Sequence, residues 1–334
     1  MTTWFPALAL LLAGGCDGSD SDDTGDTGAF VCEPSGEPGA WSLMADGVGN
    51  GVLVAAWSDG GTVRMVGGEM GGGAGVMARY RDGVVCTEDA VTERALWWIH
   101  GAGPGEWYAV GEAGTIVHAT GDARVREDVE TGATLFGAWD DGTDVWAVGG
   151  DIVARTGEVW RRHDGTWSRF ASDLPGVLFK VWDGLIVGDH VSYVIDGEDL
   201  VFHDPGERLT TVRGRSDTDV YAVGGTGSPR VLHWDGSDWT RFDETGLTQP
   251  LSGVWTAPDE QLWVTGNFGE AAFHDGSGWQ MAVPPVTVEH FHAVWRHCDE
   301  TLFVGGNLFS VGGNYGTIGR YGPPIDPVTV EPCE

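Results

Sequence analysis

Residues 135–150 read LFGAWDDGTDVWAVGG, and residues 53–68, LVAAWSDGGTVRMVGG, match them without a gap. Three further stretches follow the same template: 209–225 (LTTVRGRSDTDVYAVGG), 251–267 (LSGVWTAPDEQLWVTGN) and 291–307 (FHAVWRHCDETLFVGGN). Two copies depart from it: 96–112 has one extra residue, and 178–189, LFKVWDGLIVGD, lacks the polar turn. Such self-similarity indicates one supersecondary unit repeated along the chain.

A glycine follows the second apolar run of every copy and gives the number of units. These glycines lie 36 to 44 residues apart, at Gly67, Gly111, Gly149, Gly188, Gly224, Gly266 and Gly305. The spacing therefore predicts seven units of about forty residues each.

Each unit resolves into four short strands. The first resembles LFGAW and leads through a polar turn to the second, DVWAVGG, which is apolar on both sides, as expected of a strand covered on both faces. A third strand ends in a turn, as in RVLHWDG (230–236), and the fourth is amphipathic, as in DWTRF (238–242). Four strands in about forty residues, with Trp and Gly at fixed places, indicate the blade of a propeller. We predict an all-β, seven-bladed β-propeller with four-stranded blades.

The two ends of the repeat region predict how the ring closes. The seventh unit begins at Phe291 and reaches a third strand at 317–322, but no fourth strand of the repeat type follows. An orphan segment before the first unit, GAWSLM (39–44), matches GWQMAV (278–283), the fourth strand of the sixth unit. We therefore expect the N-terminal strand to complete the last blade, which removes a long unpaired edge.

These repeats resemble those of a known group. DVWAVGG (144–150), RVLHWDGSDW (230–239) and LSGVWTAP (251–258) are similar to the Trp-rich propeller repeats of lipoproteins from myxobacteria and their relatives. They are more distantly similar to the propellers of photosystem II assembly factors and to sialidase-type repeats. The resemblance covers roughly residues 39–322. It implies the fold and carries little about activity, because propellers host many functions.

Composition limits the partners. The 334 residues include 55 Gly and 17 Trp, and 50 acidic against 18 basic residues give a net charge of −32. A phosphate backbone is repelled by such a chain, so we expect no nucleic-acid partner. We find no G-x-S-x-G, P-loop, H-E-x-x-H or paired C-x-x-C motif, and expect no catalytic residue and no cofactor.

The N-terminus predicts export and a lipid anchor. The apolar run 4–13 is too short to span a bilayer but suits a signal peptide. It leads to Leu12-Ala13-Gly14-Gly15-Cys16, which resembles a bacterial lipobox, with Ala13 where Leu is usual; ordinary secretion is the alternative. We expect a signal peptide over 1–16, with lipid attachment at Cys16. Residues 17–31 are expected to be a disordered acidic linker rather than a calcium loop, because a loop starting at Asp20 has Val31 where a bidentate Glu is needed. The propeller would span 32–334.

Four cysteines remain if Cys16 is lipidated, and an exported chain favours disulfides. Cys32 lies before the closing strand and Cys333 follows the last unit, so both would belong to one blade. We expect the pair Cys32–Cys333, which leaves Cys86 to pair with Cys298.

Two sets of polar residues are candidates for chemistry. In HFHAVWRH (290–297), His290 and His292 are close enough in sequence to chelate, but His297 is too far along an extended strand to be a third ligand, so we predict no metal site. The turns that begin at Asp164, Asp235 and Asp275 resemble the Asp box of sialidase-like propellers, and we expect these Asp side chains to cap turns.

The sequence thus favours a monomeric, non-catalytic binding or scaffolding propeller, held at the cell envelope by a membrane lipid anchor. The expected partner is a protein or glycan at one rim or at the channel mouth, and the irregular stretches 67–79 and 306–316 are candidates for contact. The alternative is a carbohydrate-active hydrolase or lyase on the same fold, which would need converging arginines or carboxylates in a channel pocket. A third possibility is an assembly factor for a membrane complex.

Overall fold

The computed structural model describes residues 37–103, 105–256, 261–297, 299–307, 315–325 and 328–333. The expected signal peptide, the linker, Cys16, Cys32 and Cys298 lie outside these ranges. Within them, none of the helices has the length and apolar character needed to cross a bilayer.

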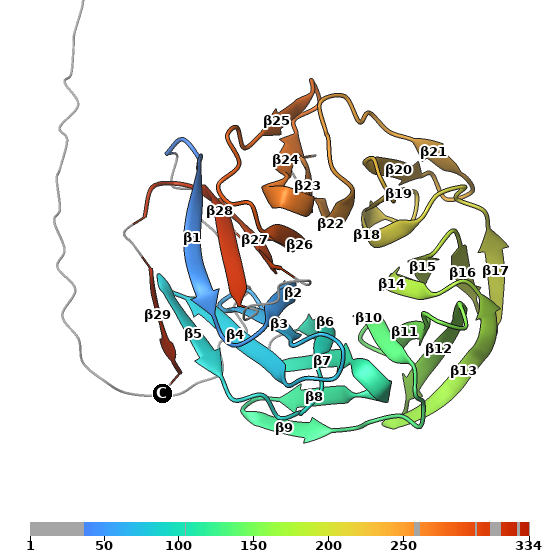
Figure 1. Cartoon of the computed structure of the whole chain (residues 1–334). Coiled ribbons are helices and arrows are strands. Elements are labelled where there is room, and N and C mark those ends of the chain that lie inside the picture. The colour runs from blue at the N-terminus through green and yellow to red at the C-terminus, as the bar shows by residue number, and fades with distance from the viewer. Residues whose placement is uncertain are drawn as a thin grey trace, which may run out of the picture. The chain divides into compact units, whose positions relative to one another are not determined.

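Seven antiparallel sheets surround a central axis, so the predicted seven-bladed β-propeller is confirmed (Figure 1). The first strand of each unit lies nearest the axis, and in blades 2 to 6 the fourth lies at the perimeter. The two 3-10 helices in the described residues are single turns, η1 (Glu112–Gly114) and η2 (Asn267–Gly269).

The strands of the blades follow one another along the chain. Blades 1 to 3 consist of β2 (Val52–Ser58), β3 (Val63–Gly68), β4 (Gly75–Arg81), β5 (Val84–Glu88); β6 (Leu96–Gly103), β7 (Glu106–Gly111), β8 (Ile116–Thr120), β9 (Ala123–Arg126); and β10 (Thr134–Asp140), β11 (Val145–Asp151), β12 (Thr156–His163), β13 (Thr166–Pro175). Blades 4 to 6 consist of β14 (Leu178–Trp182), β15 (Leu185–Gly188), β16 (Ser192–Asp196), β17 (Asp199–His203); β18 (Leu209–Ser216), β19 (Asp219–Gly224), β20 (Arg230–Trp234), β21 (Trp239–Arg241); and β22 (Leu251–Thr256), β23 (Leu262–Gly266), β24 (Ala271–His274), β25 (Trp279–Met281). Blade 7 consists of β26 (His290–His297), β27 (Glu300–Gly306), β28 (Gly316–Gly322) and β1 (Ala40–Val48).

The hydrophobic core lies between neighbouring blades. Tyr108 and Val110 of blade 2, for example, share one buried cluster with Leu135 and Val145 of blade 3. Every second strand is covered in this way from both sides, which explains why DVWAVGG does not alternate between apolar and polar residues.

The glycine that marks each repeat is required by a close approach of two backbones. A Cβ atom on Gly149 would lie 2.1 Å from the carbonyl oxygen of Thr134, and one on Gly67 would lie 1.8 Å from that of Val52. The other five glycines face the equivalent carbonyl oxygen at 1.9–2.3 Å. No side chain fits there, so the inner strand can lie against the second strand only where this residue is Gly.

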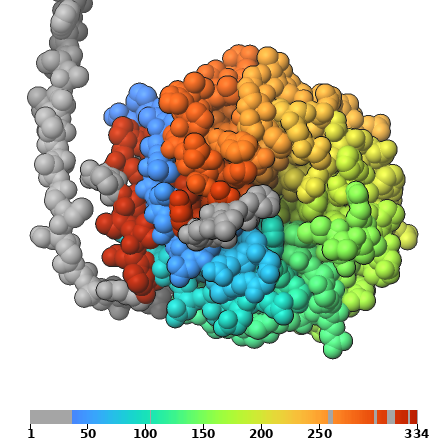
Figure 2. Space-filling view, viewed as in Figure 1, coloured from blue at the N-terminus to red at the C-terminus, as the bar shows by residue number. Residues whose placement is uncertain are grey.

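The N-terminal strand closes the ring as predicted. β1 pairs antiparallel with β28, with Trp41 opposite Tyr321 and Asp46 opposite Thr317. Figure 2 shows β1, in blue, between β28 and the C-terminal segment. Because β1 precedes blade 1 in the chain and pairs in blade 7, the first and last blades are joined by backbone hydrogen bonds.

A second closure was not expected from the sequence. β29 (Thr329–Pro332) adds a fifth strand to blade 1, parallel to β5, with Val330 opposite Val85. Cys333, next to this strand, is disulfide-bonded to Cys86 of β5, with 5.0 Å between the Cα atoms. The expected pairs Cys32–Cys333 and Cys86–Cys298 are therefore wrong, because the C-terminal segment reaches back to blade 1 rather than ending at blade 7.

Candidate binding site at the central channel

All seven inner strands share a bulge at the same position. The register of the inner and second strands shifts directly after the buried residue that opens the repeat, for example between Leu135 and Gly137 and between Phe291 and Ala293. The residue inside the shift belongs to no pair, and a bulge re-aims its side chain. These seven residues, which we call the bulge ring, are Val54, Trp97, Phe136, Phe179, Thr210, Ser252 and His292.

The bulge ring lines one cavity of about 250 Å³, to which every blade contributes. Its other lining residues are Ile152, Lys180, Arg208 and Thr211. All seven inner strands meet only around the axis, so this cavity is the mouth of the central channel. The sequence predicted a ligand at a rim or at this mouth, but it did not identify these residues.

The ring has an apolar side and a polar side. Trp97, Phe136 and Phe179 of blades 2 to 4 make edge-to-face contacts, with ring centroids 5.1 and 5.6 Å apart. On the other side, the Thr210 hydroxyl donates to the carbonyl oxygens of Val223 and Leu251, at 3.0 and 2.8 Å. The cavity therefore offers aromatic faces and fixed hydrogen-bonding groups to the same ligand.

Two cationic side chains, Lys180 and Arg208, line this cavity, and no carboxylate occurs among its described lining residues. Lys180 donates a hydrogen bond to the carbonyl oxygen of Phe136, and its ammonium lies 4.4 Å from the centroid of the Trp98 ring. The Arg208 guanidinium lies 4.8 Å from the centroid of the Phe179 ring. No Asp or Glu occurs among the described residues that line the cavity. Burial lowers the pKa of Lys180 to about 7, because no anion offsets the loss of its hydration.

Two ring nitrogens of the bulge ring find no partner among the described residues. They are the Nε1 of Trp97 and the Nε2 of His292, in the blades on either side of blade 1. Burial, followed by the repulsion of His290 and Lys180, lowers the pKa of His292 to about 4. His292 is therefore neutral at neutral pH, and its free nitrogen can bond a ligand in the channel.

Aromatic side chains gather at the opposite end of the inner strands. The residues that occupy the position of Trp139 in the seven repeats are Trp57, His100, Trp139, Trp182, Arg213, Trp255 and Trp295. The Arg213 guanidinium lies 4.1, 5.3 and 5.8 Å from the ring centroids of Trp255, Trp295 and Trp139. Because those rings belong to blades 6, 7 and 3, the blade 5 arginine crosses the channel. Desolvation there lowers its pKa to about 10.

The histidine pair predicted from the sequence is divided between two environments. His290 Nδ1 lies 3.0 Å from Asn267 Oδ1, whereas His292 lines the channel cavity, and their ring centroids are 6.3 Å apart. The side chain of His297 lies outside the described part of the molecule. In the described ranges, no group of three His, Cys, Asp or Glu side chains is arranged to hold a metal.

Two of the three Asp-Gly turns, those of Asp235 and Asp275, have the structural role that was predicted for them. Asp235 Oδ1 accepts hydrogen bonds from the backbone N–H groups of Ser237 and Asp238, both at 2.9 Å. These bonds hold the pKa of the exposed Asp235 down at about 2. Asp275 accepts equivalent bonds from Ser277, whereas Asp164 Oδ2 lies 3.6 Å from His163 Nε2. The turns cap strands and lie outside the channel cavity.

The irregular stretches and the catalytic alternative gain no support from the cavity. None of residues 67–79 lines it, and 308–314 lie outside the described residues. A retaining or inverting glycosidase needs two carboxyl groups beside the scissile bond. The described lining supplies cations, aromatic rings and hydroxyls instead and contains no such pair of carboxyl groups.

The comparisons with known proteins agree with the architecture. No family model matches the chain, and no curated protein matches its sequence. Among solved structures, the chain is similar to YCF48 bound to D1 peptide (14% identity, TM-score 0.61, 88% of this chain and 100% of that one). It is also similar to YCF48 from Cyanidioschyzon merolae (11%, TM-score 0.62, 85% and 99%) and to the WD40 propeller domain of Doa1 (11%, TM-score 0.58, 85% and 97%). At these identities the likeness shows the fold, and the chain is a β-propeller of the same general architecture as these proteins.

Proposed function

We propose that this protein is a non-catalytic binding propeller whose channel mouth takes an acidic, partly apolar segment of a protein partner. One observation carries the proposal: Lys180 and Arg208 stand beside aromatic rings, without a carboxylate in the described lining of the cavity. In a chain with a net charge of −32, a cationic pocket that lacks counter-charges selects anions against the field of the whole molecule.

Each part of such a segment has a counterpart in the cavity. A carboxylate accepts charge-assisted hydrogen bonds from Lys180 and Arg208, and an aromatic or aliphatic side chain packs on Trp97, Phe136 and Phe179. The polar side, formed by Thr210, Ser252 and His292, pairs with the peptide backbone. Peptide binding by the similar propeller YCF48, which was solved with a D1 peptide, supports this use of the fold.

We also propose that the propeller is exported and tethered to the cell envelope, as lipoproteins of the resembling myxobacterial group are. Cys16 would carry the lipid, residues 1–16 would be the signal peptide, and 17–31 would be the linker. The lipobox-like sequence motivates the anchor. The disulfide between Cys86 and Cys333 supports export, because such bonds persist in oxidising compartments.

A matched pair of peptides tests the binding function. Calorimetry would compare acetyl-Phe-Glu-Phe-Glu-amide with its Gln counterpart, on the wild type, on Lys180→Met/Arg208→Met and on Arg155→Met. Arg155 is exposed and pairs with Asp189 outside the cavity, so it serves as the charge control. We expect the acidic peptide to bind at least about tenfold more tightly than the Gln peptide. We also expect the double variant alone to lose this preference. Equal binding of both peptides, or an equal loss in Arg155→Met, would contradict the proposal.

The anchor is tested separately in cells. Palmitate label on the wild-type protein but not on Cys16→Ala is the expected result. An unlabelled wild-type protein in the culture medium would instead indicate ordinary secretion.

A further inference from the structure

Blade 4 departs from the repeat where its first two strands meet. Only residues 183–184 separate β14 from β15, and Trp182 pairs directly with Leu185. In blade 3, residues 141–144 separate the equivalent strands, and Trp139 pairs with Trp146. The turn of blade 4 is therefore two residues shorter.

Blade 4 also lacks the ion pair that neighbouring blades place beside this turn. In blade 3, Asp144 Oδ2 accepts a hydrogen bond from Arg161 Nε at 2.9 Å. In blade 5, Asp219 Oδ2 accepts one from Arg215 Nε at 2.6 Å. Blade 4 keeps the aspartate as Asp183, five residues before its repeat glycine Gly188, but Leu185 pairs with Val194 where Trp146 of blade 3 pairs with Arg161. Blade 4 therefore retains the carboxylate, and an apolar side chain replaces its cationic partner.

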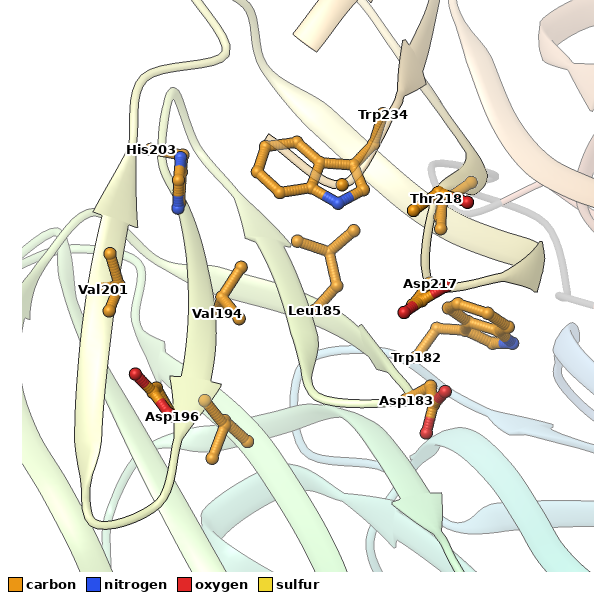
Figure 3. Close-up of a pocket in the computed structure, with 13 residues that line it drawn as sticks. Trp182, Asp183, Leu185, Val194, Asp196, Val201, His203, Asp217, Thr218 and Trp234 are labelled. Atoms are coloured by element: carbon orange, nitrogen blue, oxygen red, sulfur yellow. The ribbon is translucent and has the colours of Figure 1, made fainter. Parts of the chain in front are cut away.

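The result is a pocket of about 360 Å³ between blades 4 and 5 (Figure 3). Its floor consists of Leu185, Val194, Val220 and the indole of Trp234, and His203 contacts that indole edge-on at 4.7 Å between centroids. Asp183, Asp196 and Asp217 stand around it on exposed turns. Asp183 and Asp217 come from the first turns of the two blades and lie on the same side of the pocket.

The three carboxylates are uncompensated. None of them has an ion pair or a side-chain hydrogen bond to any other residue in the described part of the chain. Other carboxylates at the blade interfaces are paired: Glu127 with Arg162, for instance, at 2.8 Å between blades 2 and 3. Three unpaired negative charges around an apolar floor attract a cation that carries an apolar stem.

Trp234 supplies a second, independent indication of a ligand. Its side chain is 4% exposed, yet its indole N–H has no acceptor among the described residues. Figure 3 shows the nitrogen edge of the ring turned toward Leu185 and the turn of Asp217 and Thr218, inside the pocket. This N–H opens into the pocket, where an acceptor on a bound molecule can pair with it.

We infer that this pocket binds a lysine or arginine side chain of a protein partner. The aliphatic stem lies on Leu185 and Val194 and against the Trp234 ring, the cationic head pairs with Asp183 and Asp217, and a backbone carbonyl of the partner accepts the indole N–H. A peptide-borne cation meets all three demands, whereas a free alkylammonium ion has no carbonyl oxygen.

This site goes beyond the proposed channel function and is independent of it. Phe179, near the start of β14, lines the channel cavity, and Trp182, at the end of the same strand, lines this pocket. The two sites therefore lie at opposite ends of the inner strand and attract ligands of opposite charge. Failure of one binding assay does not affect the other.

The test uses three probes and two matched variants. Calorimetry or NMR titration would compare acetyl-Ala-Ala-Lys-Ala-Ala-amide, its norleucine analogue and butylammonium chloride on the full propeller. Asp183→Asn/Asp217→Asn removes two charges at the pocket; Asn tolerates the left-handed backbone of residue 183, where φ is +45°. Glu93→Gln/Asp122→Asn removes the same charge at exposed positions elsewhere.

We expect the lysine peptide to bind the wild type at least about fivefold more tightly than either other probe. The pocket variant should weaken that binding about tenfold, and the control variant should leave it within a factor of two. Equal binding of the norleucine peptide, equal losses in the two variants, or no binding of the lysine peptide would overturn the proposal. Equal affinity for butylammonium would overturn the role of Trp234.

Discussion

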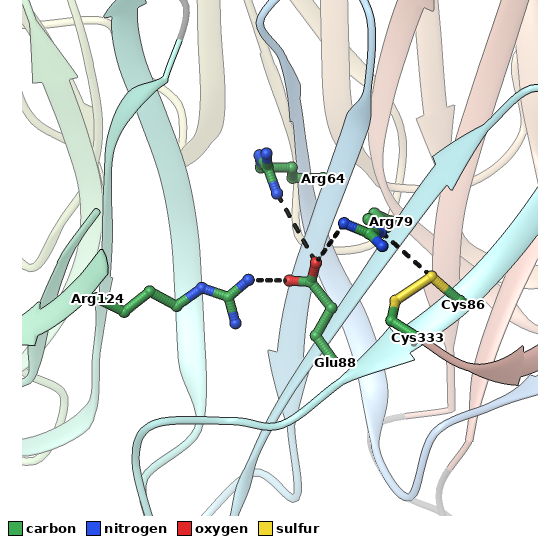
Figure 4. The surroundings of a disulfide bond; sticks show 6 residues. All are labelled: Arg64, Arg79, Cys86, Glu88, Arg124 and Cys333. Atoms are coloured by element: carbon green, nitrogen blue, oxygen red, sulfur yellow. Dashed lines mark hydrogen bonds and ion pairs between the residues drawn. A yellow bond between two sulfur atoms is a disulfide. The ribbon is translucent and has the colours of Figure 1, made fainter. Parts of the chain in front are cut away.

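Glu88 of blade 1 accepts a hydrogen bond from Arg124 of blade 2, with 2.6 Å between Oε2 and Nη2 (Figure 4). Its other oxygen, Oε1, lies 3.5 Å from Arg79 and 3.8 Å from Arg64. The carboxylate is 6% exposed, so it is shielded from bulk water. One acidic side chain thus neutralises part of a cluster of three arginines beside the disulfide of Cys86 and Cys333.

Replacing Glu88 by Gln should destabilise the propeller, because three guanidinium groups would then face a neutral amide. We expect the free energy of unfolding, measured with urea, to fall by about 2–4 kcal/mol. Glu93→Gln, at an exposed position of the same segment, is the control and should change it by less than about 0.5 kcal/mol. Similar values for the two variants would mean that the arginine cluster is already balanced by solvent.

The disulfide should hold the C-terminal strand rather than the ring. In Cys86→Ser/Cys333→Ser, the parallel pairing of β29 with β5 loses its covalent anchor, while β1 still pairs with β28. We expect hydrogen exchange at residues 329–333 to accelerate at least about tenfold, with no change in blades 2 to 6. Uniform acceleration in all blades would instead show that the bond supports the whole ring.

The repeated glycines should be the least replaceable residues of the second strands. Gly149→Ala places a Cβ atom 2.1 Å from the carbonyl oxygen of Thr134, which forces the inner strand away. We expect a loss of about 3 kcal/mol in the free energy of unfolding. Gly132→Ala, where a Cβ atom meets nothing within 4 Å, should change it by less than about 0.5 kcal/mol. Equal tolerance of both changes would refute the close-approach explanation.

Lys180 should make stability depend on pH. Its pKa is about 7 in the folded protein and about 10.4 in an unfolded chain. Between these values the unfolded chain binds more protons, so stability rises with pH and levels off below pH 7. From pH 7 to pH 9, the wild type should gain up to about 1.4 kcal/mol per pH unit relative to Lys180→Met, as measured by urea unfolding. Parallel pH profiles of the two proteins would show that the Lys180 ammonium stays charged in the channel.

The same titration should control the proposed binding of acidic segments. A carboxylate ligand favours the protonated ammonium, so affinity for acetyl-Phe-Glu-Phe-Glu-amide should be higher at pH 6 than at pH 8.5. We expect a difference of about tenfold in the wild type and a much smaller one in Lys180→Met. Binding that does not vary over this range would assign the recognition of the anion to Arg208 alone.

The sequence predicted the ring because every blade requires the same residue types at the same positions of its repeat. The residue that opens each repeat, a leucine in six blades and Phe291 in the seventh, is a core residue. The repeat glycine of each second strand cannot carry a side chain, because the carbonyl oxygen opposite occupies that space. Both constraints are local and recur seven times, so they are visible as a pattern. GAWSLM (39–44) revealed the first closure because β1 copies the fourth-strand pattern.

The features that the sequence did not reveal depend on single residues or on long-range pairing. β29 pairs in parallel and follows no repeat pattern, so the partner of Cys333 was misassigned. The bulge ring contains Val, Trp, Phe, Thr, Ser and His, and only the register shows that these unlike residues share a position. Lys180 and Arg208 are candidate anion-binding residues because no carboxylate occurs in the described lining of the cavity, and the sequence does not show which residues share that lining. The pocket at Trp234 had one visible signal, the missing turn of residues 178–189.

The bulge ring has a consequence for how this molecule can change. Each blade presents one side chain to the axis from a residue that pairs with no other strand. The buried residue before the bulge, a leucine or Phe291, pairs with the repeat glycine of the second strand and maintains the frame. A substitution at Val54, Ser252 or His292 therefore alters the chemistry of the channel cavity and leaves the pairing of the strands intact. In the proposed channel site, the side chains that contact the ligand differ from those that hold the strands together. Ligand specificity can therefore be changed by substitutions in one blade at a time.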